Sequence, residues 1–285
     1  MRYMVIALGI VLVSGLAAQA QWTAYNDNCF DPNQIEVRND PNGVLVHYTS
    51  PNVTNYAIAA SGYANSGELV KKSDGTGTGV TATVTESGGM HWQPDTSDNW
   101  YGGYDPVAGT DAKNTFGGIV DMTGVTYYAS AGWWVDVELS GLDPNKTYNF
   151  ATSAARSKPT YSDRISIFTL NGADSFTNSS TPGTDNELET YTTGTDILGP
   201  NQVRFITGDN NTLGYVARWT DIDPGDDGTI TIRTTHDAAS NGGYKAYAPD
   251  VFMLQEVGVI PEPSTIAMLV MGLFGLLAHA WRKRS

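Results

Sequence analysis

The stretch MHWQPDTSDNWYGGYDP, residues 90–106, combines aromatic rings with short polar side chains. Tyr and Trp rings suit the apolar faces of sugar rings, and the neighbouring carboxylates and amides can bond sugar hydroxyls. The other residues of the stretch favour turns, so we predict a loop that either contacts a glycan or closes one end of a core. The candidate glycan contacts are Trp92, Trp100, Tyr101 and Tyr104.

The acidic segment 221–228 is a second candidate site, because carboxylate oxygens are the ligands that Ca²⁺ prefers. The spacing does not match an EF-hand, since Gly225 stands where a third ligand would fall. Pro-Gly and Asp-Gly are also good turn residues between two apolar strands. We predict a turn with no metal or cofactor, and calcium is the alternative. The carboxylates concerned are Asp221, Asp223, Asp226 and Asp227.

Catalytic patterns are missing from residues 21–260. The three histidines, His47, His91 and His236, form no HExxH zinc motif, and there is no Gly-x-Ser-x-Gly elbow. The single cysteine, Cys29, excludes an intrachain disulfide. We interpret it as incidental, and pairing with another molecule or a specialised role is the alternative. Carboxylates are abundant, but any pair of them is more easily explained as solvated surface than as a glycosidase pair. We predict no catalytic residues, and a glycoside hydrolase is the weaker alternative.

The charge of the chain limits its partners. Leaving out Arg2 and the basic residues 282–284 reduces the 16 Lys and Arg to 12, and leaving out Glu262 reduces the 30 Asp and Glu to 29. Residues 21–260 therefore carry a net charge of about −17. This balance argues against nucleic acid or an anionic membrane surface as a partner.

The elements that position these side chains are predicted to be strands. Trp134–Leu139 alternates apolar and acidic residues, which places one face in a core and the other in water. Asn171-Gly172 is a hairpin signal, and residues 219–232 are also interpreted as a hairpin. No stretch between 21 and 260 shows a helical apolar period. Further strands are predicted at 147–151, 164–170, 203–206, 215–219, 230–233 and 251–257.

These strands predict an all-β protein with a single antiparallel β-sandwich over residues 40–257, preceded by an N-terminal segment, 21–39. We expect Trp133, Trp134 and Trp219 to pack in its core. The succession ELSGLDPNKTYNF, RISIFTLNG, WTDIDPGDDGTITI and a strand after GGYKAYAPD resembles a galactose-binding-like, carbohydrate-binding jelly-roll. That resemblance implies a jelly-roll-like sandwich.

The first 20 residues have the pattern of a secretory signal peptide. Arg2 precedes an apolar run, and Ala18 and Ala20 form a small-x-small cleavage site. We therefore expect export through the Sec machinery, cleavage by signal peptidase and a mature protein that begins at Gln21.

The last 28 residues, 258–285, combine a proline-rich motif, an apolar run and a basic end. Residues 264–281 would form a helix of about 27 Å, just under the ~30 Å hydrocarbon core of a bilayer. We therefore predict a transmembrane helix over 264–281. Arg282, Lys283 and Arg284 would stop transfer and stay on the cytoplasmic side.

Pro261, Glu262, Pro263 and Ser264, followed by this span and basic end, resemble the PEP-CTERM sorting signal; only His279-Ala280-Trp281 interrupts the usual pattern. The resemblance implies processing by an exosortase near Pro-Glu-Pro, so that the membrane anchor is transient. It also implies a cell-surface or extracellular location, often beside exopolysaccharide. We predict a non-catalytic surface protein associated with extracellular polysaccharide, and a specific carbohydrate-binding module is the alternative.

Overall fold

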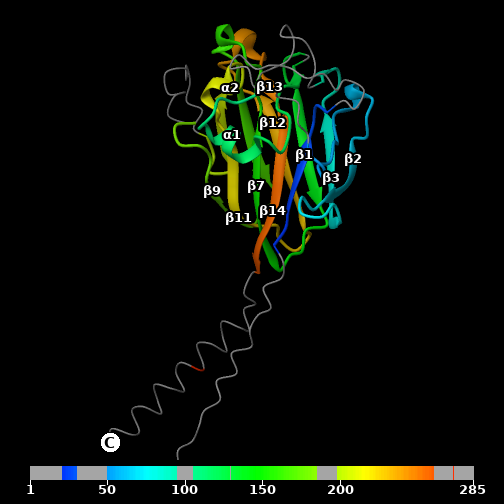
Figure 1. The fold of residues 1–285 in the computed structure, drawn as a ribbon. Helices are drawn as coiled ribbons and strands as arrows, with labels where there is room; N and C mark the ends of the chain where they lie inside the picture. The colour runs from blue at the N-terminus through cyan, green and yellow to red at the C-terminus, as the bar shows by residue number, and fades with distance from the viewer. Residues whose placement is uncertain are drawn as a thin grey trace, which may run out of the picture.

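The computed structural model describes residues 21–30, 50–94, 105–128, 130–184 and 198–259, together with Gly272. Two antiparallel sheets face each other, and a small third sheet lies near one end (Figure 1). The elements are β1 (Thr23–Asp27), η1 (Ala59–Ser61), β2 (Ser66–Val70), β3 (Gly77–Glu86), β4 (His91–Gln93), α1 (Asp111–Phe116), β5 (Val125–Tyr127), β6 (Trp134–Ser140), β7 (Lys146–Ser153), η2 (Pro159–Tyr161), β8 (Ile165–Asn171), β9 (Ser175–Asn178), β10 (Gln202–Ile206), α2 (Asn210–Leu213), β11 (Ala217–Asp223), β12 (Thr229–His236), η3 (Asn241–Gly243), β13 (Tyr247–Ala248) and β14 (Val251–Val259).

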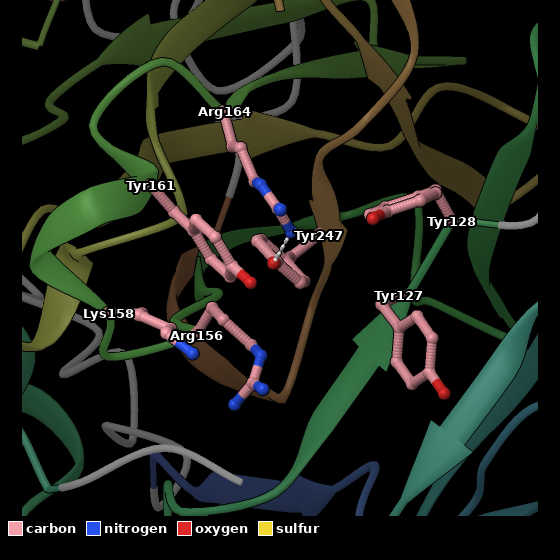
Figure 2. Close-up of a pocket in the computed structure, with 7 residues that line it drawn as sticks. All are labelled: Tyr127, Tyr128, Arg156, Lys158, Tyr161, Arg164 and Tyr247. Atoms are coloured by element: carbon pink, nitrogen blue, oxygen red, sulfur yellow. Dashed lines mark hydrogen bonds between the residues drawn. The ribbon is translucent and has the colours of Figure 1, made fainter. Parts of the chain in front are cut away.

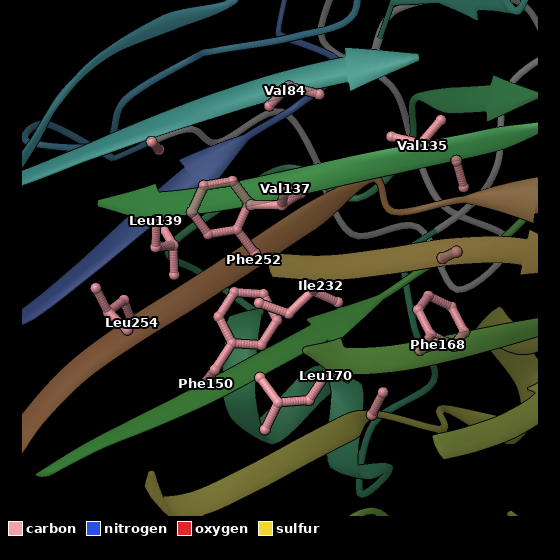
Figure 3. Close-up of a cluster of buried hydrophobic side chains, with 14 of the residues drawn as sticks. Val84, Val135, Val137, Leu139, Phe150, Phe168, Leu170, Ile232, Phe252 and Leu254 are labelled. Atoms are coloured by element: carbon pink, nitrogen blue, oxygen red, sulfur yellow. The ribbon is translucent and has the colours of Figure 1, made fainter. Parts of the chain in front are cut away.

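The core lies between the two large sheets, where apolar side chains from both sheets meet (Figure 3). In β6, Val135, Val137 and Leu139 point inward because side chains alternate along a strand. Trp133 and Trp219 are buried as predicted. The prediction for Trp134 is wrong: the same alternation places it with the outward-facing acidic residues, and its ring lies 4.8 Å from the Arg233 guanidinium carbon.

The large sheets have the strand orders β1-β14-β7-β11-β9 and β10-β8-β12-β6-β3-β2. From β6 to β12 the chain crosses to the other sheet after every strand. The antiparallel sandwich is confirmed, but two predicted hairpins are wrong. Residues 219–232 connect β11 to β12 across the sandwich. Asn171-Gly172 leads from β8 to β9 in the opposite sheet, because β10 and β12 already occupy both sides of β8.

β1 pairs with β14, with Thr23 opposite Gln255. This strand extends the sandwich N-terminal to the predicted boundary at residue 40. The start of β1 and the end of β14 therefore lie at the same end of the sandwich. The start of β14 lies at the opposite end, roughly 30 Å away for a strand of nine residues.

Helices contribute little: α1 has six residues and α2 has four. Within the described residues, no helix is both long enough and apolar enough to span a bilayer. The predicted signal peptide and the transmembrane segment 264–281 lie outside the described residues, apart from Gly272.

Candidate functional site

A cavity of about 170 Å³ lies near the end of the sandwich where β14 begins. Figure 2 shows two tyrosines on one side of it, two cations and a third tyrosine on the other, and Arg164 with Tyr247 between them. The small sheet β13-β5-β4, the residue that follows β5 and the segment between β7 and β8 supply these residues. The lining consists of Tyr127, Tyr128, Arg156, Lys158, Tyr161, Arg164 and Tyr247.

Backbone hydrogen bonds hold the cationic wall in place. The N–H groups of Arg156 and Lys158 donate to the carbonyls of Thr207 and Gly208, both at 2.9 Å. A side chain at Gly208 would not fit, since its Cβ would lie 2.0 Å from the Tyr161 carbonyl oxygen. Ser157, between the two cations, has a φ of +56°, a conformation that costs a non-glycine residue about 1 kcal/mol or more. Such strain is typically stored at functional sites.

Arg164 lies at the centre of the cavity. Its side chain donates to the Tyr247 hydroxyl. The guanidinium carbon lies 3.3 Å from the centroid of the Tyr161 ring, in a cation–π contact. Arg164 is only 9% exposed, and its Nε has no hydrogen-bond partner among the described residues. A nearly buried cation thus lines the cavity, and one of its nitrogens is left without a hydrogen bond.

Two hydrogen bonds to Ser166 hold the backbone of Tyr247 in place. Its carbonyl accepts a hydrogen bond from Ser166 Oγ at 2.6 Å, and its N–H donates to the same oxygen at 3.2 Å. Burial raises the pKa of the Tyr247 hydroxyl above its ordinary value, although Arg164 and Arg156 act in the opposite direction. The hydroxyl therefore keeps its proton at physiological pH.

The rings beside the cavity continue along the small sheet. His91 stacks on Tyr127 with centroids 4.8 Å apart, and Tyr128 contacts the edges of Tyr244 and Tyr247. Stacked and edge contacts thus join these rings into one cluster beside the cavity.

Of the predicted aromatic loop, the structure describes residues 90–94, 105 and 106. Trp92 lies in β4, next to β5, but its indole N–H donates to the Asn28 carbonyl at 3.1 Å and its ring lies 5.7 Å from Tyr63. Trp92 thus packs against the core and does not line the cavity. Trp100, Tyr101 and Tyr104 lie outside the described residues.

The acidic segment 221–228 forms a turn between the two sheets. Asp223 Oδ1 accepts from the Gly225 N–H at 3.0 Å, and Asp227 Oδ1 accepts from the Thr229 N–H at 3.1 Å. Asp221 and Asp226 are exposed. In the part of the chain that is described, no three His, Cys, Asp or Glu side chains gather closely enough to hold a metal ion. The absence of calcium here stays a prediction.

Cys29 is buried, with its sulfur 3.8 Å from Thr126 Oγ1. A disulfide to another molecule would therefore require the end of β1 to open.

Sequence reasoning missed the cavity because its walls come from three distant segments. One local signal was present: Arg156, Lys158 and Arg164 fall within nine residues of a strongly acidic chain. Their meeting with Tyr127 and Tyr247 depends on the pairing of β5 with β13.

Comparison with known protein families gives a match at the C-terminal end of the sequence. Residues 259–284 match the family model of the PEP-CTERM protein-sorting motif, which confirms the resemblance noted for the C-terminal residues. The motif marks a protein that is exported, held in the membrane until an exosortase cleaves it, and then found at the cell surface or outside the cell. Neither the curated proteins nor the solved structures contain a match to this chain.

Proposed function

We propose that this exported, exosortase-processed protein binds extracellular polysaccharide through the cavity at one end of its β-sandwich. The observation that carries the proposal is the cavity lining, in which four tyrosines surround the space. The cavity is smaller than pockets for drug-sized ligands, which measure roughly 300–1,000 Å³. Rigid amphipathic rings can cover the apolar faces of a sugar while their hydroxyls bond its polar groups. A space of this size suits a single sugar unit.

The position of the cavity supports this function. The membrane anchor predicted at 264–281 follows the end of β14, whereas the cavity lies near the start of that strand. Before cleavage, the sandwich would therefore present the cavity on the side facing away from the membrane, where extracellular polysaccharide is found.

The lining favours binding over catalysis. Glycoside hydrolysis requires two carboxyl groups beside the scissile bond. The described residues that line the cavity include no Asp, Glu or His. We therefore propose a non-catalytic role, with attachment to or organisation of the polysaccharide matrix as the result.

Glycan-array binding of the processed protein tests this proposal. We expect wild-type protein to bind at least one glycan, and Tyr127→Ala to weaken that binding at least tenfold. Trp134→Ala is the matched control, because Trp134 is a half-buried aromatic residue outside the cavity. Full binding by Tyr127→Ala together with lost binding by Trp100→Ala would instead place the site in the 90–106 loop. Absence of glycan binding by wild-type protein would contradict the proposal.

A further inference from the structure

We infer that the cavity is selective for a sugar that carries a carboxylate, such as a uronic acid residue of an acidic polysaccharide. The inference rests on the proposed function and adds the chemical class of the ligand. Its basis is the distribution of cations in an acidic protein.

Positive charge is concentrated in this cavity. Arg156, Lys158 and Arg164 are three of the 12 basic residues in the region 21–260. The rest of that region is rich in acidic residues, yet the described lining contains none. At physiological ionic strength, charges more than about 8 Å apart are largely screened. A bound group therefore experiences the nearby cations far more than the negative charge of the whole molecule.

Arg164 differs from the arginines elsewhere in the fold. Arg204, Arg218 and Arg233 each pair with an aspartate, at 3.2, 2.7 and 2.6 Å. Among the described residues, Arg164 has no carboxylate within ion-pair distance, although it is only 9% exposed. A buried charge without a counter-ion is costly, and a carboxylate ligand would supply the missing partner. The planar guanidinium also matches a carboxylate in shape.

The tyrosines distinguish a sugar acid from a simple anion. A free inorganic anion would use the cations but has no face to place on aromatic rings. A uronate has both a carboxylate for Arg164 and Lys158 and a ring for Tyr127 and Tyr128. The lining therefore offers complementary groups to both parts of such a residue.

Titration calorimetry of the processed protein tests the inference. The probes are oligomers of glucuronate, galacturonate, mannuronate and guluronate, each paired with its carboxyl-reduced derivative, which keeps the linkage but is neutral. We expect at least one acidic oligomer to bind at least tenfold more tightly than its reduced partner. Lys158→Met and Arg164→Gln should remove that preference, and Lys71→Met, outside the cavity, should retain it. Unchanged melting temperatures show that the variants fold. If Arg164→Gln does not fold, the result for Lys158→Met decides the test.

Four results would overturn the inference. Equal or tighter binding of the reduced oligomers would show that the carboxylate is not recognised, while leaving the proposed function intact. Binding of neutral sugars alone would have the same meaning. Inorganic phosphate or sulfate binding as tightly as the best uronate would show a plain anion site. Failure of every acidic and neutral oligomer, and of the glycan array, would reject both the inference and the proposed function.

Discussion

At the scale of single residues, Asp250 is an ionisable group whose charged form the fold opposes. Asp250 is fully buried just before β14. Its Oδ2 accepts from the Ala155 N–H at 2.6 Å, and its Oδ1 has no hydrogen-bond partner among the described residues. Burial, with a smaller contribution from nearby Asp27, raises the pKa of Asp250 well above its ordinary value. The neutral carboxyl is therefore the form that suits this position.

Asp250→Asn should stabilise the protein at neutral pH. The folded protein binds this proton more tightly than the unfolded chain does. The favourable contribution of Asp250 is therefore complete below about pH 4, the ordinary aspartate pKa, and is lost as pH rises toward the raised value. Asparagine still accepts from Ala155 and cannot ionise.

Urea unfolding between pH 4 and pH 8 measures this effect. The variant should match wild type near pH 4 and become increasingly more stable than wild type as pH rises to 7, since each unit by which the fold raises the pKa is worth about 1.36 kcal/mol. A difference in unfolding free energy that does not widen as pH rises would show that Asp250 ionises freely in the fold.

At the scale of elements, α1 is held to the five-stranded sheet by one ion-pair network. The Arg218 guanidinium on β11 donates to both oxygens of Asp111, at 2.7 and 3.0 Å, and to Thr115 Oγ1 at 2.7 Å. Thr110 accepts from the Lys113 N–H at 3.3 Å as the N-cap. A six-residue helix is too short to be stable alone, so its place depends on these contacts and on buried Phe116.

Arg218→Lys should destabilise the protein by about 1–2 kcal/mol, because an ammonium cannot reproduce the two parallel bonds of a guanidinium. Arg233→Lys is the matched control. Arg233 makes the same two-bond contact to Asp136, but its side chain is 48% exposed compared with 23% for Arg218. It should cost less than about 1 kcal/mol. Equal losses in urea unfolding would mean that the Asp111 pair does not anchor α1.

The strands themselves were largely predictable, but their arrangement was not. Runs such as Ile230–Ile232 show the two-residue period that one buried sheet face imposes. Which sheet each strand joins depends on non-local pairing, so local sequence signals predict hairpins at two connections that cross the sandwich. The cavity was not predictable for the same reason, since Tyr127 and Tyr247 become neighbours only through the pairing of β5 with β13.

At the scale of the whole molecule, the start of β1 and the end of β14 lie at one end of the sandwich, and each is the described element next to a predicted processing point. β1 begins two residues after the predicted signal-peptide cleavage point, and β14 ends at Val259, two residues before Pro261. Trp22 and Lys146 both bond the Glu256 carboxylate near this end, at 3.0 and 2.8 Å. Cleavage at either point would therefore leave the paired strands intact.

Replacing Pro261, Glu262 and Pro263 by alanine should leave the protein uncleaved in the membrane. The two prolines hold the peptide extended, and neither has a backbone N–H that could donate a hydrogen bond. An extended peptide of this kind is a suitable shape for a protease to bind. Mass spectrometry of wild-type surface protein should find no peptides from residues 266–285, and Trp134→Ala, with its motif intact, should behave in the same way. Arg284-containing peptides on most of the exposed wild-type protein would mean that the anchor is permanent.

The central claim, that the cavity holds polysaccharide, is tested most directly by hydrogen–deuterium exchange of the processed protein with and without polysaccharide from the surface of the producing cells. We predict slower exchange at residues 125–128, 156–164 and 245–248, and no change in the turn at 221–228. Unchanged exchange in all three segments at saturating polysaccharide, or protection confined to other parts of the sandwich, would contradict the claim.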